Sequence, residues 1–482
     1  MKYQPTIGLE IHVELKTKTK MFCASLNDPN EKRPNVNVCP VCMGHPGTLP
    51  VINKEAVRKV LMCGKALNGK LADYSRFDRK NYFYPDLPKG YQISQYKFPL
   101  VEGGELEVEI KNQKSKIKIT RIHLEEDTGR LIHAKDETSS LVDFNRAGVP
   151  LMELVTETCI NSGEQARKFA EELQLVLRYL EISDADMEKG QMRVEVNISI
   201  SQISNLKSKK LGTKVEIKNL NSFRSVERAV EYEIKRQTAV LEAGEKVIHE
   251  TRGWDEDKQK TFSQREKEMA HDYRYFPEPD LPPLKISELD FDLSLPELPK
   301  EKRKRFKDKY GLKDEAVEIF VQDISAGKFF ESVVSYFADK LKEIISLASN
   351  YITSDIAGLL KESKKTFSDM KINPEMFAKL IAMADKEEIS SRATKDVLKI
   401  MFEEGGDPEK IVKEKGLAQT SDDSFIKNIV EDVVKNNPAV VEEYKNGKEN
   451  ALQFLVGQGM KLSKGKANPA VLQKMLKEKL GK

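Results

Sequence analysis

The hydrophobic periodicity of the chain changes at a proline-rich segment, and this change constrains the fold more than any other sequence feature. Before the segment, apolar and polar residues alternate with period two in several runs, most clearly in residues 8–15. Such alternation is typical of strands with one buried face. Residues 276–299 then contain six prolines, which disfavour helices and central strands alike. Beyond them, the spacing of apolar residues is helical almost to the C-terminus.

These patterns predict an α+β protein with three domains. We expect a large antiparallel sheet with embedded helices in residues 1–295. One embedded helix is predicted to begin after Ser162, with Gln165 completing a capping box. We expect a helical domain in residues 296–405. The Gly-Gly-Asp-Pro sequence at 405–408 predicts a break, followed by a second helical domain in residues 406–482.

Composition excludes several classes of protein. The chain has 482 residues, which suits two or three domains, and no apolar run long enough to span a membrane. The first residues lack the apolar core of a signal peptide, so we expect a cytoplasmic location. With 80 basic and 77 acidic residues the net charge is only +3, so any nucleic-acid site must arise from local clustering. Five cysteines in so long a chain do not form a disulfide framework.

The first predicted strand has a polar face of unusual composition. Glu10, His12 and Glu14 alternate with apolar residues and therefore share one face. Two carboxylates flanking an imidazole are suited to bind a hard divalent cation. The alternative is a solvated strand face without a ligand.

Acidic residues recur on other predicted strands. Residues 121–127 carry three consecutive acids, Glu125, Glu126 and Asp127, and further acids are Glu195 and Glu216 on alternating strands. If these strands pair, their polar faces form an acid-lined floor that would hold Mg²⁺ together with nucleotide phosphates. Mutual repulsion between the acids favours a bound cation. Periodicity alone does not determine which strands pair.

Two further segments contain candidate ligands. Residues 77–91 interleave basic and aromatic side chains, which suits phosphate neutralisation and base stacking, or a loop packed by its own aromatic rings. Cys23, Cys39 and Cys42, with His45 nearby, could supply ligands to zinc. The alternative for the cysteines is a set of reduced thiols in a folded loop.

Taken together, these segments resemble the B subunit of the glutamyl/aspartyl-tRNA amidotransferase over nearly the whole chain. The matching motifs are IGLEIHVEL at 7–15, the stretch 77–95, RIHLEEDTG at 121–129, KNLNSF at 218–223, DYRYFPEPD at 272–280, FLVGQ at 454–458 and KGKANP at 464–469. The resemblance implies a cradle-shaped sheet domain, a helical domain and a YqeY-like tail. It also implies a heterotrimer with an amidase A subunit and a small C subunit.

The resemblance further implies an activity and a set of site residues. The B subunit phosphorylates the side-chain carboxylate of misacylated Glu-tRNA(Gln) or Asp-tRNA(Asn) with ATP, and ammonia from the A subunit then displaces phosphate. The implied Mg²⁺ and activation site consists of Glu10, His12, Glu125, Glu126, Glu195 and Glu216. Lys80 and Lys89 match positions near the ammonia path and the catalytic cavity. The implied tRNA contacts of the tail are Lys448, Lys461, Lys464 and Lys466.

The chain departs from the family pattern at two positions. Some members hold zinc with C-x-C and C-x-x-C motifs, whereas here Ser25 stands in place of the second cysteine. Gly459 stands in a predicted tail helix where the family has a larger apolar residue, at a cost of roughly 1 kcal/mol. Two other classes of function stay open at this point: a non-catalytic tRNA-presenting protein and a zinc-ribbon scaffold. The sequence does not determine which of the two misacylated tRNAs is the substrate. It also does not determine whether Glu125 or Glu126 is the metal ligand.

Overall fold

A computed structural model describes residues 3–111, 113–133, 139–202, 211–266, 273–337, 342–419, 423–463 and 465–481. The chain forms two compact units, Met1–Pro299 and Lys300–Lys482, which are considered separately below. Among the described residues, no helix combines the length and apolar character needed to cross a bilayer.

The first unit is built on a ten-stranded sheet with β1 (Tyr3–Glu14) near its centre. β11 (Pro150–Thr156) and β12 (Met192–Gln202) flank β1, and both run antiparallel to it. The order is β15-β14-β13-β12-β1-β11-β8-β6-β2, with β7 paired to β8 outside this path. The remaining strands are β2 (Lys70–Leu71), β6 (Val101–Glu102), β7 (Glu105–Ile110), β8 (Gln113–Glu126), β13 (Val215–Leu220), β14 (Glu250–Asp255) and β15 (Lys260–Glu266).

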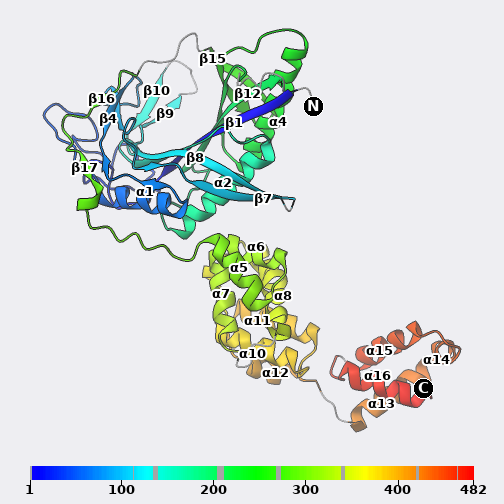
Figure 1. Ribbon diagram of the computed structural model, residues 1–482. Coiled ribbons are helices and arrows are strands. Elements are labelled where there is room, and N and C mark those ends of the chain that lie inside the picture. The colour runs from blue at the N-terminus through cyan, green and yellow to red at the C-terminus, as the bar shows by residue number, and fades with distance from the viewer. Residues whose placement is uncertain are drawn as a thin grey trace. The chain divides into compact units, whose positions relative to one another are not determined.

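The predicted α+β fold is confirmed, with one exception to the antiparallel pairing. β13 and β14 are parallel, because α4 (Phe223–Glu242) and the segment after it return the chain to the same end of the sheet. Helices α1 (Lys54–Ala66), α2 (Gly163–Tyr179) and α4 pack against the sheet (Figure 1). They cover the apolar face, where Leu9, Ile11 and Val13 are fully buried.

The predicted helix start at Ser162 is confirmed, with a different capping pattern. Ser162 Oγ accepts the backbone N–H of Gln165 at 3.2 Å, as a capping residue should. The Gln165 side chain accepts the backbone N–H of Asn161 at 3.0 Å, one residue earlier than a capping box requires.

Short strands lie beside the polar face of the sheet. β4 (Asp78–Asn81) pairs with β5 (Tyr91–Ser94) and with β16 (Phe276–Pro277), while β17 (Leu284–Lys285) pairs with β3 (Tyr74–Ser75). Part of the proline-rich segment therefore completes small sheets. β9 (Arg130–His133) and β10 (Ser140–Asp143) form a further pair, and η1 (Ile286–Glu288) is a 3₁₀ turn.

The described part of the second unit is helical. Its first helices share an aromatic core in which the rings of Phe306, Phe320 and Phe330 are in contact. The helices of this part are α5 (Pro299–Tyr310), α6 (Asp314–Gln322), α7 (Ile324–Val334), α8 (Lys342–Asn350), the π-helical turn Tyr351–Ile356, α9 (Ala357–Ser363), η3 (Phe367–Asp369), α10 (Pro374–Asp385), α11 (Ser391–Glu403) and α12 (Pro408–Lys415).

The C-terminal helices have a hydrophobic core of their own around Leu455 and Leu472. They are α13 (Asp423–Asn436), α14 (Pro438–Lys445), α15 (Asn450–Leu462) and α16 (Pro469–Leu480). The Gly-Gly-Asp-Pro break lies between α11 and α12, with Gly405 and Gly406 at φ +80° and +110°. A domain boundary at residue 405 stays a prediction.

Candidate active site

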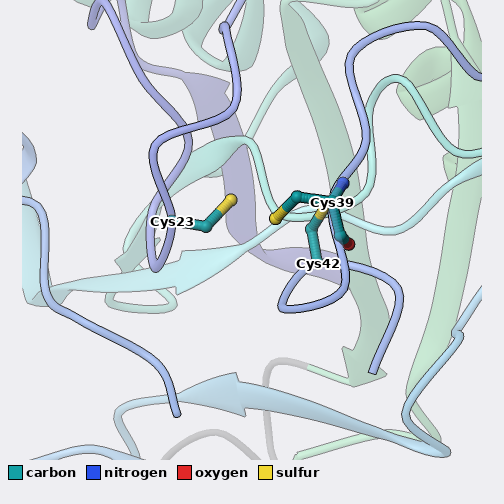
Figure 2. A group of neighbouring side chains, drawn as sticks. All are labelled: Cys23, Cys39 and Cys42. Carbon is teal, nitrogen blue, oxygen red and sulfur yellow. The ribbon is translucent and has the colours of Figure 1, made fainter. Parts of the chain in front are cut away.

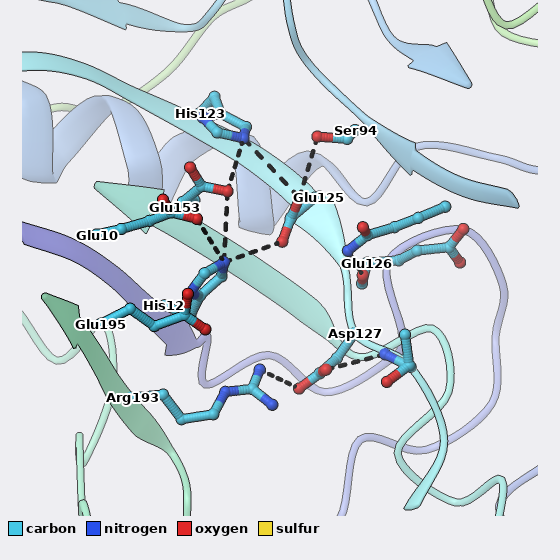
Figure 3. A network of polar contacts seen from close by, with 12 residues as sticks. Glu10, His12, Ser94, His123, Glu125, Glu126, Asp127, Glu153, Arg193 and Glu195 are labelled. Carbon is cyan, nitrogen blue, oxygen red and sulfur yellow. Dashed lines mark hydrogen bonds and ion pairs between the residues drawn. The ribbon is translucent and has the colours of Figure 1, made fainter. Parts of the chain in front are cut away.

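Three adjacent strands place one row of polar side chains across the sheet. In the register of β1, β11 and β8, His12 lies opposite Glu153, which lies opposite His123. Glu153 Oε2 is 3.3 Å from His12 Nε2 and 3.4 Å from His123 Nε2 (Figure 3). Glu153 and His123 are almost completely buried. A carboxylate therefore bridges two imidazoles at the centre of the polar face.

Glu125 and Glu10 extend this row on opposite sides. Glu125 lies two residues beyond His123 on β8 and therefore on the same face, with its Oε1 3.6 Å from His12 Nε2. Ser94 Oγ donates a hydrogen bond to Glu125 at 3.0 Å. Glu10 Oε1 is 4.0 Å from His12 Nε2. Two sets of three side chains, Glu10–His12–Glu153 and His123–Glu125–Glu153, thus have ligand atoms within 4.8 Å of one another.

Glu195 and Glu216 stand at the edge of this cluster. Glu195 lies opposite Glu10 in the β1–β12 register. Lys218 Nζ is 2.8 Å from Glu195 and 3.8 Å from Glu216, so one ammonium bridges the two acids. Glu216 also accepts a hydrogen bond from Thr251 at 2.7 Å. Both acids are on the predicted polar face, but a lysine already partly neutralises them.

The protonation states reflect burial and crowding of charge. Burial lowers the pKa of His12, but the hydrogen bond with Glu153 and the charges of neighbouring acids raise it more, to about 9. Burial and the charge of Glu153 raise the pKa of Glu10 to about 6. Burial also raises the pKa of Glu153, yet the two histidines lower it further, to well below its usual range. Several acids are therefore crowded around one imidazole, and their mutual repulsion favours a bound cation.

Lys80 supplies a half-buried positive charge next to the cluster. Its ammonium lies 5.1 Å from the ring centroid of Tyr273 and 6.0 Å from that of Tyr82. Burial lowers the pKa of Lys80, but the charges of Glu125, Glu153 and nearby tyrosines together raise it more, so the pKa lies above its ordinary value. Lys80 is therefore charged and faces the acids.

Glu126 points away from the cluster. Consecutive residues of a strand face opposite sides, so Glu125 and Glu126 cannot share the polar floor. Glu126 instead lies 2.6 Å from Lys89 Nζ and accepts the backbone N–H of Ile93 at 3.0 Å. This pair lines a separate pocket that also contains Cys23, Cys42 and His45. The structure thus brings together Glu10, His12 and Glu125, but not Glu126.

The predicted tRNA-binding lysines lie in the C-terminal helices or next to them. Lys461 on α15 and Lys466 after it are exposed, while Lys448 Nζ is 3.5 Å from Glu443. Lys464 lies outside the described residues. Exposure is what phosphate contact requires, and their role as tRNA contacts stays a prediction.

Sequence reasoning missed Glu153 and His123 as members of the cluster. Glu153 is a single acid within the apolar run PLMELVT, and a charge in a buried strand needs a partner. His123 shares the strand parity of Glu125. Its Nδ1 has no hydrogen-bond partner among the described residues. The acid within an apolar run and the shared parity of His123 and Glu125 were both visible in the sequence. Only the pairing of the strands connects these residues to His12.

A cluster of carboxylates and imidazoles flanked by a charged lysine, with several shifted pKa values, is typical of an enzyme active site, here in an α+β fold. Comparison with known proteins agrees. The model of the GatB/GatE catalytic domain matches residues 5–291, and that of the GatB domain matches residues 328–480. The chain belongs to the GatB family.

Proteins similar over the whole chain share one description, the B subunit of the aspartyl/glutamyl-tRNA(Asn/Gln) amidotransferase. The chain is 47% identical to the protein of this description from Caldicellulosiruptor bescii, over 100% of both chains. Its identity to the relative from Persephonella marina is 46%, again over 100% of both chains. The relative from Crocosphaera subtropica is 45% identical, with 99% of this chain and 98% of the relative covered.

Proposed function

We propose that this chain is the subunit that activates the side-chain carboxylate of misacylated Glu-tRNA(Gln), Asp-tRNA(Asn) or both by ATP-dependent phosphorylation, before amidation by ammonia. Membership of the GatB family supports a subunit of a glutamine-dependent amidotransferase that uses ATP. The observation that carries the proposal is the convergence of Glu10, His12, Glu125 and Glu153 on one face of the sheet.

The cluster fits a hard divalent cation. Its side chains offer carboxylate oxygens and imidazole nitrogens, the raised pKa of His12 reflects unbalanced negative charge, and both favour a cation at this position. The residues that would hold Mg²⁺ are Glu10, His12, Glu125 and Glu153, with Glu195 and Glu216 farther out. Bound there, Mg²⁺ would draw negative charge from the phosphates of ATP.

Lys80 would orient the reacting anions. A charged ammonium in a partly dehydrated site stabilises negative charge more strongly than one in water. Lys80 is half-buried and remains charged, and its neighbour Glu125 belongs to the cluster. We infer that Lys80 binds the transferred phosphoryl group or the phosphorylated carboxylate.

The Lys89–Glu126 pair would serve a different step. It lines a pocket on the other side of β8 from the acidic cluster, so it does not hold the same ligand. Its polar atoms suit the passage of ammonia released by an amidase A subunit. We infer that a small C subunit completes the complex and that the C-terminal lysines bind the tRNA backbone.

A non-catalytic tRNA-presenting protein is the principal alternative. Such a protein needs basic surfaces, whereas buried acids would repel the phosphates of RNA. The nearly complete burial of Glu125 and Glu153 favours the enzyme.

Amidation assays on the purified complex test the proposal. We expect His12→Ala to lower ATP cleavage and amidation by about 100-fold, because a group that stabilises transition-state charge is lost. Glu126→Gln should lower glutamine-dependent amidation more than amidation with added ammonium salt. Glu109→Gln, an exposed acid on β7, is the matched control. Full activity of both His12→Ala and Glu126→Gln would refute the site, and parallel assays with the two misacylated tRNAs identify the substrate.

A further inference from the structure

Three thiols converge beside the Lys89 pocket and are unused by the proposed chemistry. Cys23 comes from the loop after β1, while Cys39 and Cys42 come from one turn (Figure 2). Their three sulfurs lie within 4.8 Å of one another. Cys42 is buried, and the other two are half-buried.

Cys42 has several polar neighbours, among them the carbonyl oxygen of Cys39, which lies 3.4 Å from its Sγ. Its Sγ accepts the backbone N–H of Cys39 at 3.1 Å and lies 3.7 Å from Lys20 Nζ. The Ser25 hydroxyl is 4.0 Å away. The backbone N–H of Cys39 and the ammonium of Lys20 both stabilise the thiolate form of Cys42 over the thiol.

Lys20 requires a negative partner at this position. Its side chain is fully buried, and its other hydrogen bond goes to the neutral carbonyl of Phe144 at 3.2 Å. Burial lowers the pKa of Lys20, and the groups that raise this pKa most are Cys42, Cys23 and Cys39 rather than any carboxylate in the described part of the chain. A buried cation without a counter-ion is costly, so the sulfur of Cys42 is the partner that can carry the charge. In agreement, the hydrogen bond with Cys23 and the charge of Lys20 lower the pKa of Cys42 against the effect of burial.

The cluster does not suit structural zinc, which takes four nitrogen or sulfur ligands. Ser25 occupies the position of the fourth cysteine in the C-x-C pattern. Among the described residues, no fourth Cys, His, Asp or Glu joins the three sulfurs within 4.8 Å. His45 lines the same pocket but is not part of the cluster. Moreover, the ammonium of Lys20 would repel a dication bound to Cys42.

We propose that Cys23, Cys39 and Cys42 form a metal-free thiol site that hydroperoxides oxidise, with Cys42 as the attacking thiolate and Cys23 as the resolving thiol. Cys42 Sγ attacks the peroxide, the O–O bond breaks, and the departing oxygen takes up a proton to leave as water or an alcohol. The Cys23 sulfur then attacks the resulting sulfenic acid. An S–S bond forms as the S–O bond of the sulfenic acid breaks. The hydroxide that leaves takes the proton of Cys23 and becomes water.

The pocket provides access and connects this site to its surroundings. Cys23 and Cys42 both line it, so a small peroxide can reach the buried sulfur. Gly44, in the turn that follows Cys42, packs so closely on Lys89 that a Cβ at this position would lie 2.6 Å from Lys89 Cγ. Movement of the turn on disulfide formation would therefore reach the Lys89–Glu126 pair.

The first test uses the full-length chain without added metal. Zinc content is measured by elemental mass spectrometry, and thiols are mapped by alkylation and peptide mass spectrometry after treatment with hydrogen peroxide. We expect much less than one zinc per chain and a Cys23–Cys42 disulfide. Cys159 is an exposed thiol and serves as the internal control. Cys42 should oxidise at least about tenfold faster, because it is already a thiolate.

Variants separate the roles of the residues. Cys23→Ser should halt the reaction at a sulfenic acid that dimedone labels on Cys42. Ser25→Cys should restore four sulfurs, bind one zinc per chain and lose peroxide sensitivity. Stoichiometric zinc in the wild type, or oxidation of Cys42 no faster than that of Cys159, would overturn the proposal. Neither of these readouts requires amidotransferase activity.

Discussion

Glu153 lies directly opposite His12 in the antiparallel pair of β11 and β1, and its Oε2 is 3.3 Å from His12 Nε2. The same carboxylate approaches His123 from the other side. A single acid on β11 therefore contacts two imidazoles, one on each of the strands that flank it. Glu125 and Glu10 are placed around this bridge.

We predict that Glu153→Gln lowers amidation by about 100-fold and raises the Mg²⁺ concentration needed for half-maximal activity. The amide keeps the shape of the side chain but loses the charge that holds both imidazoles and a cation. Initial rates over a magnesium titration measure both effects. Glu109→Gln controls for the loss of an acid elsewhere in the sheet. Wild-type rates for Glu153→Gln at every magnesium concentration would contradict the assignment.

Replacing Lys80 tests whether its half-buried charge acts on the reacting anions. Lys80→Met keeps the length and apolar contacts with Tyr82 and Tyr273 but removes the ammonium. We expect kcat to fall by about 100-fold, since the lost group stabilises negative charge in the transition state. Lys80→Arg, which retains the charge, should recover part of the rate. Single-turnover amidation gives the measurement, and equal rates for Lys80→Met and the wild type would refute the role.

A second buried network makes the stability of the first unit depend on pH. Glu233 on α4 accepts two hydrogen bonds from Arg236 at 2.8 Å and is fully buried. Burial raises its pKa, but hydrogen bonds from Arg236 and other donors lower it more, so the net pKa lies below its ordinary value. The stabilisation is therefore complete above the unfolded pKa of about 4.3 and is lost as pH falls through the folded pKa.

Glu233→Gln should cost about 3 kcal/mol at neutral pH, because Arg236 and Arg252 both lose the charge of a fully buried carboxylate. It should also flatten the decline in stability below about pH 4.3. Urea unfolding is monitored by the fluorescence of Trp254, the only tryptophan of the chain. Trp254 lies on β14 in the first unit, where it is buried next to Tyr232 of α4. Its fluorescence therefore reports on the first unit alone. Glu242→Gln, an exposed acid on α4, is the control. Identical pH profiles for Glu233→Gln and the wild type would contradict the linkage.

Two glycines of α15 should respond differently to alanine. Gly457 is exposed, and an added Cβ would meet nothing within 4 Å, so Gly457→Ala should stabilise the helix by about 1 kcal/mol. Gly459 is buried, and its added Cβ would lie 2.6 Å from Leu472 Cδ2. The resulting crowding should cancel most of the gain. Amide hydrogen exchange of α15 and α16 distinguishes the two variants, and equal protection would refute this account.

The sequence predicted the secondary-structure elements and the polar faces of the strands better than it predicted which strands lie side by side. Alternation in β1 placed Glu10 and His12 on one polar face, and the same rule could have selected Glu125 over Glu126. The close approach of Glu153 to His12 and His123 was not predictable, because a periodic pattern does not determine which strands pair or in which register. The parallel pairing of β13 and β14 depends in the same way on the path of the intervening chain.

The central position of β1 also has a consequence for synthesis on the ribosome. This strand emerges first, yet its two neighbours begin only at Pro150 and Met192. A nascent chain must therefore carry β1 without either partner until much of the first unit has been translated. The catalytic floor then assembles late and as a whole, so polypeptides truncated before β12 should lack partial activity and depend on chaperones to remain dispersed.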